Sequence, residues 1–185
     1  IKLGLGESAR GIKVSEGEYS TLVLQNNLTN DKYTYNIESL NDDQSVTFKY
    51  LENGRLAIYG DYIKITAGDN QDDNLILVGN NNELFTNDGN DTVRLGHVID
   101  ANGEYYHQES SFNKIDTGSG DDYIAFFGSG NDLNAGDGTD KVILSYIYSN
   151  GKLVTNDEGS KIIFTYDNEN YVEDGNTITI KGGED

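Results

Sequence analysis

One stretch decides the fold of this chain: residues 117–125, which read T-G-S-G-D-D-Y-I-A. Its two glycines permit the positive φ angles of a tight turn, which residues with a Cβ adopt only at a cost. The part that follows Asp122 alternates polar and apolar side chains, so it is a short strand that sends Ile124 inward and its neighbours outward. The unit is therefore a turn followed by a strand.

The same unit recurs along the chain at intervals of about nine residues. Units of the form G-x-D-x-U, where U is a large apolar residue in three of the four, begin at Gly89, Gly120, Gly130 and Gly138. Asp73 and Asp91 are 18 residues apart, as are Asp122 and Asp140, and Asn82 lies halfway between the first two. Two nine-residue units thus make one 18-residue coil.

Stacked coils of this kind place strand above strand at a spacing of about 4.8 Å and form two parallel sheets. On our numbering, one edge of the roll carries Asp73, Asp91, Asp122 and Asp140, and the other carries Asn82, Asn113 and Asp132. Turn carbonyls and aspartate carboxylates of adjacent coils then converge into an oxygen cage suited to Ca²⁺. An alternative role for each aspartate is an Asx turn, in which its side chain bonds its own backbone.

The pattern resembles the G-G-x-G-x-D-x-U-x nonapeptide of RTX proteins, the calcium-binding parallel β-rolls of type I-secreted toxins, enzymes and adhesins. Every copy here lacks the first glycine, and the resemblance covers about residues 68–143. It implies several bound Ca²⁺ ions. The ligands that it implies are Asp73, Asp91, Thr117, Ser119, Asp122, Phe127, Ser129, Asp132, Ala135, Asp137 and Asp140.

The charge of the chain supports a cation partner. The 185 residues carry a net charge of −19, and residues 69–140 alone hold 15 acidic and two basic residues, a net of −13. Such carboxylates repel one another unless something neutralises them. The same charge argues against nucleic acid and against anionic membranes, and no apolar run is long enough for membrane insertion as a helix.

The segments that flank the repeats predict antiparallel strands, so the whole chain is expected to be one all-β domain. Residues 1–67 and 144–185 are expected to form antiparallel caps on a parallel β-roll that spans residues 68–143. Asn53-Gly54 is a type I′ hairpin signal, and we expect no helix. Because the chain lacks cysteine, methionine and a leader-like start, we interpret it as a disulfide-free, monomeric module of a larger protein.

An insertion at residues 96–111 interrupts the repeats, and its Asn102-Gly103 pair predicts a hairpin that projects from the roll. Insertions into repeat arrays often form binding loops, so Tyr105, Tyr106 and His107 are candidate ligand-binding residues. The alternative is an ordinary surface hairpin whose tyrosines lie against the roll. With a two-residue turn, His97 pairs with Gln108, so the two histidines face opposite sides and a zinc site is not expected.

No pattern of catalytic residues emerges, and we expect no enzyme activity. The resemblance implies a secreted or bacterial cell-surface module of an RTX-type adhesin that binds a surface peptide or glycan in a calcium-dependent way. Two alternatives remain open: a structural, calcium-stabilised segment of a surface-layer protein or adhesin stalk, and a non-catalytic accessory roll of a secreted enzyme.

Overall fold

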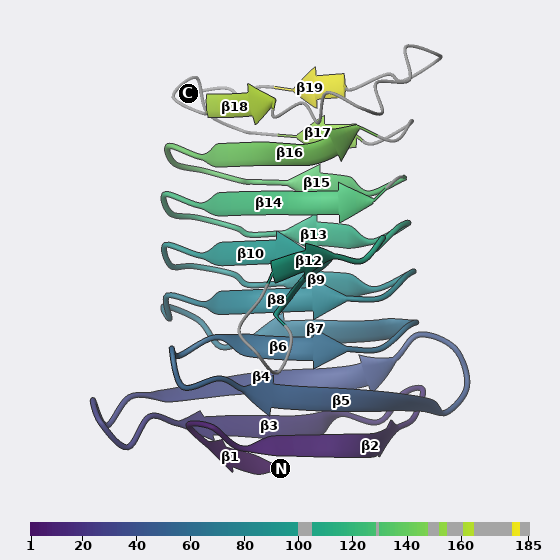
Figure 1. The fold of residues 1–185 in the computed structure, drawn as a ribbon, viewed down its shortest axis with the longest axis vertical. Coiled ribbons are helices and arrows are strands. Elements are labelled where there is room, and N and C mark those ends of the chain that lie inside the picture. The colour runs from purple at the N-terminus through teal and green to yellow at the C-terminus, as the bar shows by residue number, and fades with distance from the viewer. Residues whose placement is uncertain (100–104, 129, 148–151, 155–160, 165–178, 182–185) are drawn as a thin grey trace.

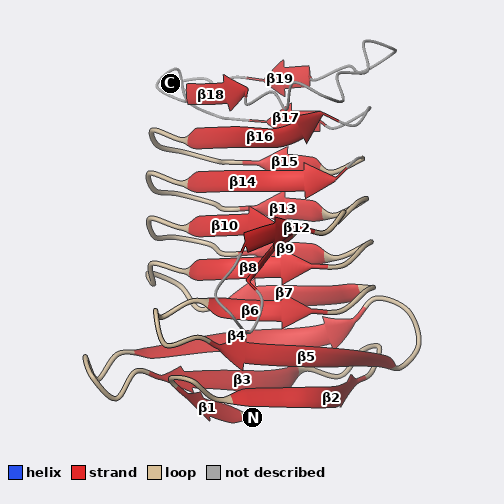
Figure 2. Cartoon of the chain, in the orientation of Figure 1, coloured by secondary structure: helices blue, strands red, loops and turns tan. Residues whose placement is uncertain are grey.

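The computed structural model describes residues 1–99, 105–128, 130–147, 152–154, 161–164 and 179–181. Every regular element in this part of the chain is a strand (Figure 2), so the predicted all-β class is confirmed. None of the described residues forms a helix that could cross a membrane.

The strands stack into a β-solenoid with two parallel sheets that face each other (Figure 1). One sheet has as parallel neighbours β6 (Leu56–Tyr59), β8 (Asn74–Val78), β10 (Thr92–Leu95), β14 (Tyr123–Gly128), β16 (Lys141–Ile147) and β18 (Lys161–Phe164). The opposite sheet has β7 (Ile63–Ala67), β9 (Glu83–Phe85), β13 (Lys114–Asp116), β15 (Asp132–Asn134), β17 (Lys152–Val154) and β19 (Thr179–Lys181).

The apolar residue of each nonapeptide points into the space between the sheets. Val93 lies in register between Leu75 and Ile124, and all three side chains are buried. The facing sheet contributes Leu84 and Ile115 in the same way. Removing these aliphatic columns from water supplies the main driving force for coil stacking.

Glycine in the turns lets the coils approach closely. At Gly118 φ is +85°, and a Cβ there would lie 1.9 Å from the carbonyl oxygen of Asn87 in the coil below. The position therefore requires glycine both for its left-handed backbone and for the space that the neighbouring peptide occupies.

The N-terminal segment closes one end of the solenoid. It comprises β1 (Lys2–Gly4), β2 (Ser8–Val14), β3 (Ser20–Gln25), β4 (Lys32–Ser39) and β5 (Gln44–Tyr50). The β2–β5 and β3–β4 pairs are antiparallel, as the sequence predicts. Tyr35, Phe48 and Tyr50 are buried in the same core as the apolar columns of the roll. The roll itself begins at Leu56 rather than at residue 68, because β6 and β7 already pair parallel with the next coil.

The turn that joins β5 to β6 differs from the predicted type I′ turn. The N–H of Gly54 donates to the carbonyl of Leu51, and Gly54 has a φ of +80° while Asn53 is not left-handed. Such a turn followed by one left-handed residue is a three-residue hairpin loop, in which glycine serves as a bulge. The hairpin was predicted correctly and its turn type was not.

The C-terminal flank also differs from the expected antiparallel cap. The described strands β16, β17, β18 and β19 all pair parallel with the strand one coil below. The solenoid therefore continues past residue 143, with aliphatic residues still aligned between coils, although Val142 and Ile162 are 20 residues apart where Ile124 and Val142 are 18. The Asn150-Gly151 pair, which is a further hairpin signal in the sequence, lies outside the described residues.

Candidate functional site

The predicted aspartate edge exists as a ladder of four buried carboxyl groups. Oδ1 of Asp91 accepts a hydrogen bond from the backbone N–H of Asp73 (2.8 Å), and Oδ1 of Asp122 accepts one from the N–H of Asp91 (2.8 Å). Oδ1 of Asp140 accepts the N–H of Asp122 in the same way (3.0 Å). At the lower end, Tyr35 donates its hydroxyl to Oδ1 of Asp73 (2.6 Å). The predicted set Asp73, Asp91, Asp122 and Asp140 is thus brought together on one edge.

The second oxygen of these carboxyl groups is unsatisfied. Oδ2 of Asp73, Asp91 and Asp122 is buried and has no hydrogen-bond partner. Burial raises the pKa of Asp73 and Asp122 to about 7 and that of Asp91 to about 6, although hydrogen bonds to the ladder oppose the shift. A buried carboxylate oxygen without a partner is costly. The ladder therefore needs a proton or a cation at each of these three positions.

The opposite edge is an asparagine ladder, which requires neither a proton nor a cation. Oδ1 of Asn113 accepts the N–H of Asn82 (2.9 Å), and Oδ1 of Asn131 accepts the N–H of Asn113 (2.9 Å). Their amide groups donate to carbonyls of the preceding turns, for example from Asn113 Nδ2 to Gly79 O (3.1 Å). The sequence numbering had placed Asp132 in this ladder, and that placement is wrong. Asp132 is exposed and pairs in register with Lys114, because Asn131 keeps the nine-residue step to Asp140.

The turn carbonyls predicted as calcium ligands already accept hydrogen bonds between coils. Ser119 O accepts the N–H of Gly89 (2.9 Å), and Asp137 O accepts the N–H of Gly120 (2.8 Å). Thr117 hydroxyl donates to Ala135 O (3.1 Å), and Phe127 O accepts the N–H of Ser110 (3.1 Å). Thr117 O accepts a hydroxyl hydrogen bond as well, from Thr86 (3.2 Å). Ser129 lies outside the described residues.

The aspartate edge matches calcium in the chemistry of its ligands, since it offers only oxygen atoms and includes three that lack a partner. Within the residues that the structure describes, no three acidic or histidine side chains form a group that could hold a metal ion. Coordination of a calcium ion would therefore require turn carbonyl oxygens, which already accept a hydrogen bond, to offer their second lone pair to the ion. The residues that fit this role are Asp73, Asp91, Asp122 and Asp140.

A second, exposed ladder runs beside the buried one. Asp72 Oδ1 accepts the N–H of Asn90 (2.8 Å), Asn90 Oδ1 accepts the N–H of Asp121 (2.8 Å), and Asp121 Oδ1 accepts the N–H of Thr139 (2.9 Å). Asn90 occupies the same position as the two aspartates and makes the same bond. The geometry of this position therefore needs an acceptor oxygen and not a charge.

The insertion forms a short antiparallel hairpin of β11 (His97–Ile99) and β12 (Tyr105–His107). Its register pairs His97 with His107, one residue away from the predicted partner Gln108. The predicted register, from which the histidines were expected on opposite faces, is therefore wrong by one residue. The connecting residues 100–104 lie outside the described part of the chain.

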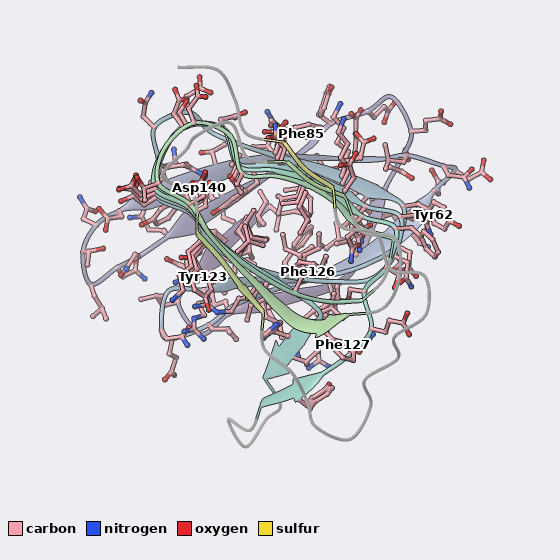
Figure 3. The ribbon with its side chains drawn as sticks, turned by 90° about the horizontal axis from the view of Figure 1, so that it is seen from above. Tyr62, Phe85, Tyr123, Phe126, Phe127 and Asp140 are labelled. Atoms are coloured by element: carbon pink, nitrogen blue, oxygen red, sulfur yellow. The ribbon has the colours of Figure 1, made fainter. Side chains whose placement is uncertain are left out.

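The hairpin projects from the outside of the roll, as the view along the solenoid axis shows (Figure 3). Val98 is 3% exposed and packs with Ala57, Ile76 and Val78 on the outer face of β6 and β8. Tyr106 remains 49% exposed. Burial raises the pKa of Tyr59, and the nearby hydroxyl of Tyr106 adds to this effect. Of the predicted ligand-binding residues, the structure describes the side chain of Tyr106, and Tyr105 and His107 only as strand positions.

Sequence reasoning missed two exposed aromatic residues on the asparagine edge. Tyr62 has a φ of +54° and precedes Ile63, whose N–H donates to Asn82 Oδ1 (3.0 Å). Phe112 has a φ of +59° and immediately precedes the ladder residue Asn113. Their rings are 40% and 64% exposed. A left-handed backbone is unfavourable for bulky residues, so nothing in local propensity indicates it. The signal available in the sequence was the spacing of Tyr62, Asn81 and Phe112, because it follows the spacing of the ladder.

Comparison with known proteins adds no identification. A scan against protein families, a search of curated proteins and a search of solved structures each returned no match.

Proposed function

We propose that the chain is a calcium-dependent, non-catalytic ligand-binding module of a secreted RTX-type adhesin, which attaches a bacterial cell to a peptide or glycan on another surface. The observation that carries the calcium part is the row of three buried carboxyl oxygens without partners, one in each of three successive coils. Calcium supplies charge neutralisation at this row, and the aspartates position the backbone of the neighbouring coil.

The binding part of the proposal rests on the surface that the roll presents. The hairpin is fixed by Val98 to a rigid sheet, and this places Tyr106 in an exposed position. Aromatic side chains held on a rigid support provide large contact area at little entropic cost. The peptide or glycan is expected to contact Tyr106 and the adjoining strand positions 105 and 107.

The calcium role is tested by titrating the metal-free protein with calcium while recording circular dichroism and thermal melting, with magnesium as the control ion. We expect a rise in melting temperature with a midpoint of about 10⁻⁴–10⁻³ M, the range of extracellular calcium modules. Asp122→Asn keeps the acceptor for the N–H of Asp91 but removes the charge, so calcium affinity should fall about tenfold.

Asp132→Asn is the matched control, because it removes an exposed carboxylate that lies outside the ladder. Its calcium affinity should equal that of the unchanged protein. Identical titrations for both variants, or a melting temperature that does not respond to calcium at all, would overturn the calcium role.

A structural role in a stalk or surface layer is the second candidate, and the unbroken hydrogen-bonded ladders along both edges favour it. The accessory-roll alternative has no observation of its own in its favour. Replacing Tyr106 with alanine distinguishes the first two functions. A ligand-binding module should lose cell-surface attachment while its calcium response is unchanged, whereas a stalk segment should lose neither.

A further inference from the structure

A cavity of about 240 Å³ lies where the N-terminal cap meets the first turn of the roll. Its walls come from β3 and β4 of the cap, from the turn between β5 and β6, and from the residues on either side of Asp73. The residues that line it include Tyr33, Tyr35, Asn53, Asp72 and Asn74. None of the described residues that line it is basic.

The walls combine aromatic surface with negative charge. Asp72 presents an exposed carboxylate at the cavity. The pKa of Tyr33 is raised first by burial and then by three carboxylates, those of Asp31, Asp73 and Asp72. Among the described residues that line the cavity, Asp72 is the charged one, and its carboxylate gives the wall negative charge.

Two buried polar atoms behind these walls have no partner. Tyr35, which lines the cavity, donates to Oδ1 of Asp73, while Oδ2 of Asp73 has no hydrogen bond and the residue is only 2% exposed. The hydroxyl of Tyr50 is likewise buried and without a partner. Neither Asp73 nor Tyr50 lines the cavity itself, and Arg94 donates to Oδ1 of the lining residue Asn74 (3.2 Å), so the negative charge at the wall is that of Asp72.

We propose that this cavity binds an organic cation, the guanidinium or ammonium end group of an arginine or lysine side chain on a peptide ligand. A tyrosine face attracts such a group through its quadrupole, and the Asp72 carboxylate neutralises it. The volume is far larger than a single metal ion requires, and the aromatic walls suit an organic group. The inference rests on the proposed binding function and names the ligand class.

The test is a titration with N-acetyl-arginine methylamide, followed by amide chemical shifts of the full chain in calcium and in chelator. The matching citrulline derivative, which is neutral and nearly the same shape, is the control probe. We expect the arginine probe to shift residues 33–35, 53–54 and 72–74, and added salt to weaken binding. The citrulline probe should leave these residues unchanged.

Asp72→Asn should weaken the arginine probe about fivefold, the effect of one exposed ion pair. The fold tolerates this change because Asn90 makes the same ladder bond one coil above. Asp121→Asn is the matched control, since Asp121 has the same ladder position two coils away and does not line the cavity. It should bind the probe as the unchanged protein does.

Equal binding of arginine and citrulline, an unchanged affinity in Asp72→Asn, or an equal loss in Asp121→Asn would overturn the proposal. Direct competition, in which the apparent affinity for the probe keeps falling in proportion to added calcium, would also overturn it, because the cavity would then be an inorganic cation site. The calcium role is tested separately, by the Asp122→Asn titration. A negative result there would not change the interpretation of the probe titrations at the cavity.

Discussion

At the scale of single residues, the two edges of the solenoid use different side chains to accept the backbone N–H groups of neighbouring coils. Asn113 accepts the backbone N–H of Asn82 and donates its amide to the carbonyl of Gly79 in the same neighbouring turn, so both of its polar ends are satisfied. Asp91 accepts the equivalent N–H but has no donor, and its second oxygen is left without a partner. Only the aspartate edge therefore depends on protons or cations.

This difference predicts how the stability of the metal-free protein changes with pH. The folded-state pKa values of Asp73, Asp91 and Asp122 are raised, so the folded chain binds more protons than the unfolded chain between about pH 4 and these raised values. The stabilisation is fully present below the unfolded pKa and is lost as pH rises through about 6 and 7. We expect the melting temperature in chelator to fall over this interval.

Asp91→Asn should make the melting temperature in chelator fall less steeply with pH. It removes one of the carboxyl groups whose pKa is raised and keeps the oxygen that accepts the ladder hydrogen bond. Asp132→Asn should leave the steepness unchanged, since Asp132 is exposed and outside the ladder. Melting curves recorded from pH 4 to pH 8 check both variants. Equal slopes for the two variants would contradict the prediction.

At the scale of elements, the hairpin packs on the roll through a hydrophobic cluster of its own. It contacts the roll through Val98, which packs on Ala57, Ile76 and Val78 and belongs to a cluster separate from the main core. The outer face of β6 and β8 is apolar where the hairpin covers it. The element that bears Tyr106 is thus attached through a hydrophobic cluster that is distinct from the main core.

Val98→Ser should release the hairpin while the roll stays folded, because it replaces the buried aliphatic contact by a hydroxyl. Loss of such a contact costs about 1–2 kcal/mol. Amide hydrogen exchange should quicken in β11 and β12 with little change in β8. Val93→Ser is the control, and it should destabilise the whole roll because Val93 lies in the main core. Unchanged exchange in the Val98 variant would show that the hairpin is held in another way.

At the scale of the whole molecule, the cap and the roll share one hydrophobic core. Phe48 and Tyr35 from the cap belong to the same buried cluster as Val93, Ile124 and Val142 from successive coils. The cap also covers the end of a stack whose terminal strands would otherwise expose apolar surface and unpaired backbone groups. Cap and roll should therefore unfold together, in spite of their different strand pairing.

Phe48→Ala tests this cooperativity, since it removes a fully buried ring from the cap alone. We expect a loss of about 3–5 kcal/mol from a single unfolding transition that includes the roll. Tyr19→Ala, at a side chain that is 63% exposed, should leave that transition unchanged. Two transitions, of which only one shifts in Phe48→Ala, would show that cap and roll are independent.

The sequence by itself determined the repeat, the two parallel sheets, the inward aliphatic positions and the two edges rich in aspartate and asparagine. These features are local, because a nine-residue spacing of glycine, aspartate and aliphatic residues repeats the same turn and strand in each coil. The tertiary structure decided that Asn131 rather than Asp132 continues the ladder and that the C-terminal strands pair parallel. It also decided the register of the hairpin and formed the cavity beside Asp72. These depend on contacts between residues far apart in the chain, where packing overrides local preference.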